Sequence, residues 1–223
     1  AGCGSGAVTG QLLERLPRGR VIAADLSPAM LAQARATLAQ HAERVTFVEV
    51  NLLEIDTVLR ASQPVDAVVS TATFHWIDDH ARLFAGLHGV MRPGAQLVSQ
   101  FGGGANLAGF MRATDTLARQ EPYRAHLAGK PLWRFYYSAE QTRERLQHAG
   151  FVDVDTWLED SPQTFTSAEA LADYARAIVL RAHLAALPAA LHARFLHECV
   201  EQIRRENGGL TLDYVRLNAD ARA

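Results

Sequence analysis

The first hundred residues alternate between short apolar runs and longer segments in which apolar residues recur every four positions. The apolar runs predict strands at residues 21–25, 45–50, 65–70 and 96–100. Strands joined through helices pair in parallel, so this part of the chain is predicted to form a doubly wound α/β domain. The fourfold repeats predict helices with apolar faces made of Val8, Leu12 and Leu16, of Met30, Ala34 and Leu38, and of Leu83, Leu87, Val90 and Met91.

Boundary residues indicate where several helices begin and end. Ser27 followed by Pro28 is typical of a helix start, because serine caps the first turn and proline suits its first position. The segment 138–141 reads Ser-Ala-Glu-Gln, a capping box that opens a helix ending at Gly150. Pro93-Gly94 is predicted to stop the helix that precedes the fourth strand.

The second half of the chain changes rhythm and predicts a helical cap beside the sheet. Helices are predicted at residues 106–120, after Ser167 and after Pro188, and strands at 152–158 and 210–219. The helix after Pro188 would bury Leu191, Phe195 and Ile203 and end at Gly208-Gly209. We therefore expect one domain over residues 1–223, with a core at 1–106, 138–160 and 209–223 and cap insertions at 107–137 and 161–208.

A glycine-rich loop opens the chain, with Gly2, Gly4 and Gly6 at alternate positions. Glycines let a backbone approach a ligand closely, and Asp25, at the end of the next predicted strand, could accept hydrogen bonds from both hydroxyls of a ribose. The loop also satisfies G-x-G-x-x-A, with Ala7 last, so it allows either a nicotinamide dinucleotide or S-adenosylmethionine. The alternative is a tight turn with a capping acid.

Composition narrows the class of protein. Hydrophobic residues make up 48% and charged residues 21%, and 22 basic residues against 24 acidic ones give a net charge of −2. This balance is typical of a globular protein and lacks the basic excess of a non-specific nucleic-acid binder. Cys3 and Cys199 have no zinc-ligand spacing, and no apolar run is long enough to span a membrane. We expect a cytoplasmic protein with a small-molecule partner, and the sequence does not indicate its oligomeric state.

Ordered motifs carry a resemblance to a known family. Residues 1–6, 24–31, 74–77 and 90–97 resemble the class I S-adenosylmethionine-dependent methyltransferases, and residues 70–80 resemble the trans-aconitate methyltransferase group of small-molecule carboxyl methyltransferases. The resemblance implies a Rossmann-like seven-stranded sheet whose last strand is antiparallel. It also implies S-adenosylmethionine as cofactor and S-adenosylhomocysteine as product. The first strand of that sheet would precede Ala1, so we expect the sequence to be part of a longer protein.

The resemblance also assigns cofactor contacts by position. It implies that the glycine loop lies along the methionyl group, that Asp25 holds the ribose and that adenine lies against apolar side chains. Asn51 stands where many members carry Asp, but its amide oxygen can still accept a hydrogen bond from the adenine amino group. The implied cofactor-binding residues are Gly2, Cys3, Gly4, Gly6, Asp25, Leu26, Met30, Asn51, Leu52, Ser70 and Thr71.

The nature of the acceptor decides whether the reaction needs a base. A carboxylate is already ionised at neutral pH, whereas a hydroxyl or an amine would need a group such as His75 to remove its proton. The alternative for His75 is a structural role beneath the cofactor. An aromatic run at 133–137 either walls the acceptor pocket or belongs to the core; the predicted acceptor residues are Trp76, Trp133, Arg134, Tyr136 and Tyr137.

The sequence also offers two weaker candidates for binding an anion and two alternative functions. Arg181 and Arg216 are possible anion ligands or surface charges, and no metal-binding motif is present. A nicotinamide-dependent oxidoreductase remains an alternative, although the chain lacks a Tyr-x-x-x-Lys pair and Lys130 is its only lysine. A non-catalytic cofactor-binding protein on the same fold is the third hypothesis, because a fold does not determine a function.

Overall fold

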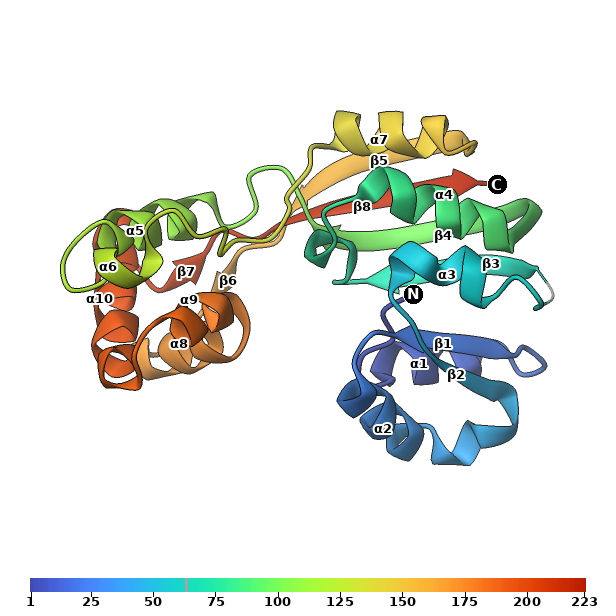
Figure 1. The fold of residues 1–223 in the computed structure, drawn as a ribbon, viewed down its shortest axis with the longest axis horizontal. Helices are drawn as coiled ribbons and strands as arrows, with labels where there is room; N and C mark the ends of the chain where they lie inside the picture. Colours follow the sequence, from blue (N-terminus) through green and yellow to red (C-terminus); the bar gives the residue numbers. More distant parts are fainter. Residues whose placement is uncertain (63) are drawn as a thin grey trace. The chain divides into compact units, whose positions relative to one another are not determined.

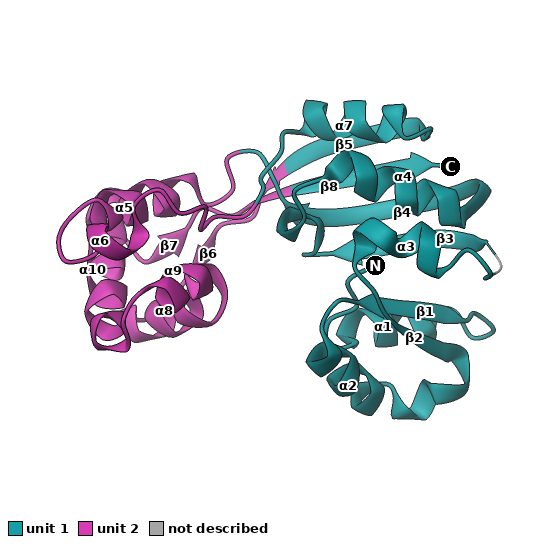
Figure 2. Ribbon diagram, viewed as in Figure 1, with its two compact units in different colours: residues 1–104, 135–158, 217–223 teal, residues 105–134, 159–216 magenta. Residues whose placement is uncertain are grey.

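The computed structural model describes residues 1–62 and 64–223 and divides them into two compact units (Figure 2). Unit 1 contains Ala1–Gly104, Phe135–Leu158 and Leu217–Ala223, and unit 2 contains Ala105–Arg134 and Glu159–Arg216. The predicted cap, residues 107–137 and 161–208, overlaps most of unit 2, but unit 2 also contains residues 105–106, 159–160 and 209–216, and residues 135–137 belong to unit 1.

Unit 1 contains two groups of strands (Figure 1). Strands β1 (Val21–Asp25) and β2 (Val45–Glu49) form a parallel pair. Strands β3 (Val65–Thr71) and β4 (Met91–Gly102) are also parallel, and they belong to a four-stranded sheet with the order β3-β4-β8-β5. The predicted strands of the first hundred residues are thus confirmed. The remaining strands of this sheet are β5 (Val152–Asp160) and β8 (Val215–Arg222).

The helices of unit 1 begin where the capping residues predict. Ser27 Oγ accepts a hydrogen bond from Met30 N at the start of its helix, and the capping box of Ser138 and Gln141 is complete. Short 3-10 turns occur at Ala39–Arg44, Leu52–Glu54 and Phe74–Trp76. The α-helices are α1 (Ala7–Arg15), α2 (Pro28–Thr37), α3 (Ile55–Val58), α4 (His80–Val90) and α7 (Ala139–His148).

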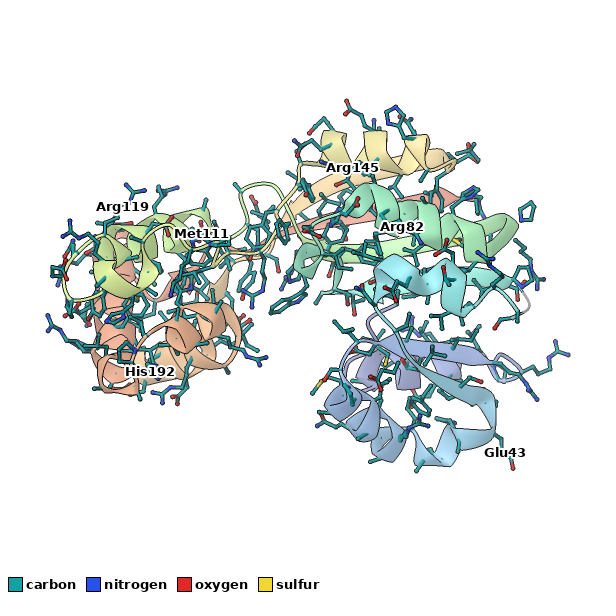
Figure 3. The ribbon with its side chains drawn as sticks, in the orientation of Figure 1. Glu43, Arg82, Met111, Arg119, Arg145 and His192 are labelled. Carbon is teal, nitrogen blue, oxygen red and sulfur yellow. The ribbon has the colours of Figure 1, made fainter. Side chains whose placement is uncertain are left out.

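One core holds α4 and α7 against the four-stranded sheet. Leu83 and Leu87 of α4 are buried with Leu97 and Phe101 of β4, and Leu146 of α7 joins the same cluster. Fully burying side chains of this size stabilises a fold by about 1.5–3 kcal/mol each. An ion pair between Arg82 of α4, labelled in Figure 3, and Asp56 of α3 adds a surface link. This packing fixes the end of β3, from which the site is built.

Unit 2 is mainly helical and has its own core. Phe195 and Ile203 are buried in it and Leu191 packs at its margin, as the predicted helical face requires. Its helices are α5 (Ala108–Ala118), α6 (Arg124–Leu127), α8 (Ala168–Tyr174), a π-helix at Ala175–Val179, α9 (Arg181–Ala186) and α10 (Ala189–Asn207), and its short strands are β6 (Gln163–Thr164) and β7 (Thr211–Leu212).

Two of the predicted elements are wrong in detail. Helix α1 buries Thr9 and Leu13, whereas Val8 and Leu16 are 38% and 45% exposed. Apolar residues occupy two neighbouring rows of this helix, so the fourfold repeat alone does not say which row packs. The helix before β4 ends at Val90, and Pro93-Gly94 lies inside the strand rather than at the helix end.

The predicted strand at 210–219 is also wrong, because the structure divides it into β7 and β8. Asp213 interrupts it by turning toward the start of α5. Its carboxylate accepts a hydrogen bond from Gly109 N at 2.7 Å, and its carbonyl accepts one from Leu107 N at 2.8 Å. A carboxylate stabilises the positive end of a helix dipole, which explains the break. Within the described residues, no helix is both long and apolar enough to cross a bilayer.

Candidate cofactor and acceptor site

The glycine loop of unit 1 bridges the ends of two strands. Gly2 N and Cys3 N both donate to Ala24 O of β1, at 2.8 and 2.9 Å. On the other side, Ala1 N donates to Val69 O of β3, and Ser70 Oγ donates to Ala1 O, each at 2.8 Å. The loop therefore lies beyond the carboxyl ends of β1 and β3, the edge of an α/β sheet at which ligands bind.

The three predicted glycines have different tasks. All have positive φ, of 70°, 54° and 88° for Gly2, Gly4 and Gly6. A Cβ on Gly2 would lie 2.2 Å from Thr73 Oγ1, and one on Gly6 would lie 3.1 Å from Leu38 Cδ1. A Cβ on Gly4 would meet no described atom within 4 Å. Gly2 and Gly6 thus permit close packing, whereas Gly4 is the place where the loop can be approached by a ligand.

The Asp25 carboxylate is oriented by backbone groups. Its Oδ2 accepts a hydrogen bond from Gly4 N at 2.8 Å, and its Oδ1 accepts one from Ser27 N at 2.9 Å. Each carboxylate oxygen has a second lone-pair direction, so the group can still accept from two hydroxyls. Leu26 is 66% exposed and Met30 37% exposed, which leaves apolar surface beside the carboxylate.

The other predicted cofactor residues take part in local hydrogen bonds. Asn51 Oδ1 accepts from Leu53 N at 3.1 Å, which caps the turn at Leu52–Glu54. The Leu52 side chain is buried in the core of unit 1. Thr71 O accepts from Thr73 Oγ1 at 3.0 Å, and the same hydroxyl donates to Gly2 O at 3.3 Å. Thr73, which the sequence analysis missed, therefore links the loop to the end of β3.

Neither cysteine has the character of a nucleophile. Burial is the main cause that raises the pKa of the Cys3 thiol, and the nearby Asp25 adds to it. Burial also raises the pKa of Cys199 to about 12. Both thiols are therefore protonated at neutral pH, and a thiol is a poor nucleophile in that form. Within the described part of the chain, no group of three or more His, Cys, Asp or Glu is arranged to hold a metal ion.

Three of the predicted acceptor-side residues meet in unit 1. The His75 ring centroid lies 5.7 Å from that of Trp76 and 6.0 Å from that of Tyr136. His75 Nδ1 accepts a hydrogen bond from Gly102 N at 3.2 Å, and His75 O accepts one from Phe135 N at 3.0 Å. Trp76 is 52% exposed. His75, Trp76 and Tyr136 therefore lie together in unit 1.

His80 and Arg145 also hold this region, and sequence patterns singled out neither of them. His80, the first residue of α4, is buried, and its Nε2 donates to Phe74 O at 2.9 Å. Burial lowers the pKa of His80. The predicted Tyr137 donates from its hydroxyl to Asp78 O at 2.7 Å, and the guanidinium of Arg145, labelled in Figure 3, lies 4.0 Å above the Tyr137 ring. A histidine at a helix start has no periodic signature, which is why the pattern missed it.

Trp133 and Arg134 lie in unit 2, where both have structural partners. Trp133 Nε1 donates to Asp115 Oδ1 at 2.9 Å, and its ring meets His183 edge-on, with centroids 4.5 Å apart. The Arg134 guanidinium donates to the carbonyls of Ile178 and Val179, at the end of the π-helix. The predicted acceptor residues are therefore divided between the two units. Of the weaker candidates, Arg216 lies 4.6 Å above the Tyr214 ring, and Arg181 begins α9.

The fold of the chain is similar to those of several proteins of known structure. The fold is similar to that of a cyclopropane synthase from Mycobacterium tuberculosis, with a TM-score of 0.58 and 16% identity over 99% of this chain and 76% of that one. It is also similar to phosphoethanolamine N-methyltransferase 2 of Haemonchus contortus in complex with S-adenosylhomocysteine, with a TM-score of 0.58 and 19% identity over 99% of this chain and 47% of that one.

Sequence similarity identifies the family of the chain more specifically than the similarity of the fold does. The family described as a methyltransferase domain matches residues 1–94. A trans-aconitate 2-methyltransferase of Deinococcus radiodurans is 31% identical over 203 residues, which cover 87% of this chain and 73% of that relative. The chain belongs to the class I S-adenosylmethionine-dependent methyltransferases. The methyltransferase therefore uses S-adenosylmethionine, which decides between the two cofactors that the glycine loop allowed.

The residues of the loop region fit this cofactor. The oriented carboxylate of Asp25 suits a ribose, the exposed surfaces of Leu26 and Met30 suit a purine, and Gly4 leaves room for close approach. When bound, the cofactor supplies an activated methyl group on a sulfonium. The protein then has to align an acceptor with that methyl group and exclude water, which can supply much of the rate enhancement without an essential side chain.

His183 is expected to make the stability of the methyltransferase depend on pH. Burial lowers its pKa to about 4 from an ordinary 6.5, with a smaller opposing effect of Asp115 and a lowering effect of Arg134. The unfolded chain therefore binds this proton more tightly than the folded one. The contribution of His183 to stability is complete above pH 6.5 and is lost as the pH falls toward 4.

This loss amounts to about 2 kcal/mol between pH 6.5 and pH 5, at about 1.4 kcal/mol per pH unit. Urea unfolding at several pH values, compared between the wild type and His183→Phe, measures it. We expect the variant to lose less stability on acidification than the wild type. Equal losses in the two proteins would show that His183 is not the group responsible.

Proposed function

We propose that this methyltransferase transfers the methyl group to a carboxylate oxygen of a small organic acid similar to trans-aconitate. The observation that carries the proposal is the similarity to a trans-aconitate 2-methyltransferase over 87% of the chain, which extends well beyond residues 1–94. The match therefore includes much of unit 2.

The chemistry of a carboxylate acceptor agrees with the side chains of the candidate site. A carboxylic acid has a pKa near 4 and is ionised at neutral pH, so no group has to remove a proton before methyl transfer. The O–CH₃ bond forms as the S–CH₃ bond breaks, and the charges of carboxylate and sulfonium cancel. We propose that Trp76, Tyr136 and Tyr137 of unit 1 contribute to the acceptor pocket, whereas Trp133 and Arg134 of unit 2 stay predictions as acceptor residues.

We also propose that the chain is one domain with a helical cap and that its strands belong to a seven-stranded sheet with an antiparallel last strand. Contacts between β4 and β8 support the direction. Gly94 N donates to Ala223 O and Ala223 N donates to Ala95 O, at the start of β4 and the end of β8. Further along β4, Gln96 pairs with Asp220 and Gln100 pairs with Asn218. The residue numbers of the paired residues rise along β4 and fall along β8, as in an antiparallel pair.

An acceptor panel tests the proposed function. The full-length protein is incubated with S-adenosylmethionine labelled in its methyl group and, in separate reactions, with tricarboxylic acids, dicarboxylic acids, their amides, and amines that carry no carboxyl group. We expect label in a product that mild base hydrolyses, as an ester requires, and only with the acids. Base-stable label on an amine, or none with any acid, would contradict the proposal.

A further inference from the structure

We infer that His75 holds the acceptor as a hydrogen-bond donor, through Nε2–H, and does not act as a general base. The inference rests on the proposed function, since it assigns a role in recognising the carboxylate. It goes further by choosing between two opposite uses of the same ring. A base must present a lone pair to the acceptor, whereas a donor must present a proton.

The contact with Gly102 decides which nitrogen carries the proton. Gly102 N donates to His75 Nδ1 at 3.2 Å. A backbone N–H cannot accept a hydrogen bond, so Nδ1 supplies the lone pair. The neutral ring then carries its proton on Nε2, because one nitrogen of a neutral imidazole is a donor and the other an acceptor. The single ring lone pair is directed at Gly102 and is engaged there, and Nε2 can only donate.

Neighbouring contacts hold the backbone that carries the ring. Phe135 N donates to His75 O at 3.0 Å, and Trp76 N donates to Thr73 O at 2.9 Å, which fixes the turn at Phe74–Trp76 from both sides. Buried His80 holds the same turn by donating to Phe74 O at 2.9 Å. The ring itself is flanked by Trp76 and Tyr136, whose ring centroids lie 5.7 and 6.0 Å away.

His75 also lies on the side of unit 1 that carries the cofactor loop. It is two residues beyond Thr73, whose hydroxyl donates to Gly2 O at 3.3 Å. Its Nδ1 contacts Gly102, the last residue of β4, so the ring lies beyond the carboxyl ends of β3 and β4. A donor at this edge can hold one oxygen of a carboxylate while the other oxygen attacks the methyl group.

A donor and a base favour different acceptors. A carboxylate has two oxygens with about four lone-pair directions, so one hydrogen bond leaves a lone pair for methylation. An amine has a single lone pair, and donation from Nε2–H would occupy it. The geometry of His75 therefore selects for a carboxylate and against an amine.

Two substitutions at one position separate these roles. In His75→Asn the amide oxygen takes the place of Nδ1 and can accept from Gly102 N, but the distant donor is lost. In His75→Gln the longer side chain can place an amide N–H near the position of Nε2. Wild type, both variants and His148→Asn, an exposed control on α7, are compared for the KM and kcat of the acid and for affinity for S-adenosylhomocysteine.

We expect His75→Asn to raise the KM of the acid by about 10- to 100-fold, the effect of losing a hydrogen bond to a charged group, with a small change in kcat. His75→Gln should recover most of this loss, and the control should match the wild type. Unchanged affinity for S-adenosylhomocysteine shows that each variant is folded. A large fall in kcat at constant KM in both variants at His75 would overturn the inference in favour of a base.

Nitrogen NMR of the ring gives a second test that needs no acceptor. In full-length protein with ¹⁵N-labelled histidine, the His75 signals, assigned by their loss in His75→Gln, should be those of the Nε2–H tautomer. The Nδ1–H tautomer would overturn the inference. If wild type methylates no carboxylic acid while His75 is in the Nε2–H form, the proposed function fails and the assigned geometry of His75 does not.

Discussion

Replacing Asp25 with alanine is expected to weaken the binding of S-adenosylhomocysteine by about 100-fold or more. The Asp25 carboxylate is held by Gly4 N and Ser27 N and is available to two ribose hydroxyls. Each hydrogen bond to a charged group contributes about 1.5–3 kcal/mol, so losing two of them corresponds to at least 100-fold in Kd. Calorimetric titration of the full-length protein measures the change.

Asp66→Ala is the matched control for this titration. Asp66 is also a strand aspartate, but its side chain is 80% exposed and pairs with Arg92 on the surface. Such a pair contributes little to stability, so the control should bind S-adenosylhomocysteine like the wild type. Asp25→Ala protein that is folded and binds with wild-type affinity would remove Asp25 from the cofactor site.

Substituting alanine in the glycine loop should separate packing from ligand approach. Gly2→Ala would place its Cβ 2.2 Å from Thr73 Oγ1 at a φ of +70°. Backbone strain and overpacking together are expected to destabilise the protein by about 2–5 kcal/mol. Gly4→Ala meets no described atom within 4 Å, so it should cost only about 1–2 kcal/mol of stability while weakening cofactor binding.

Gly94→Ala completes this set as a control, because Gly94 has a φ of +78° and, like Gly4, no described atom within 4 Å of its would-be Cβ. It lies in β4, away from the loop, so its stability should fall about as much as that of Gly4→Ala while cofactor binding is kept. Thermal unfolding and the same titration give both quantities. Equal cofactor affinity in the variants at Gly4 and Gly94 would contradict the assigned role of Gly4.

The sequence was most informative where one residue determines local geometry. Ser27 and the capping box at Ser138 predicted two helix starts, and both are confirmed. Asp25 was placed correctly at the end of β1 because a short apolar run ends there. These are local effects: the capping hydrogen bonds and the strand end depend on neighbours within a few residues, which a sequence displays directly.

Features that depend on distant contacts were not predictable in the same way. Asp213 divides β7 from β8 because it bonds Gly109, which is 104 positions earlier in the chain. Thr73 and His80 support the loop and the turn at Phe74–Trp76 through contacts that no spacing rule contains. The run at 133–137 reads as one aromatic cluster, yet Trp133 and Arg134 belong to unit 2 and Tyr136 to unit 1. Tertiary structure decides these cases.

The most direct test of the central claim is to identify the product formed from trans-aconitate. Full-length protein is incubated with trans-aconitate and S-adenosylmethionine whose methyl group is deuterated, and the acid is analysed by mass spectrometry before and after mild alkaline hydrolysis. The account predicts a single deuterated methyl ester that alkali returns to the parent acid. Recovery of unmodified trans-aconitate from protein that binds S-adenosylhomocysteine would contradict a carboxylate acceptor of this kind.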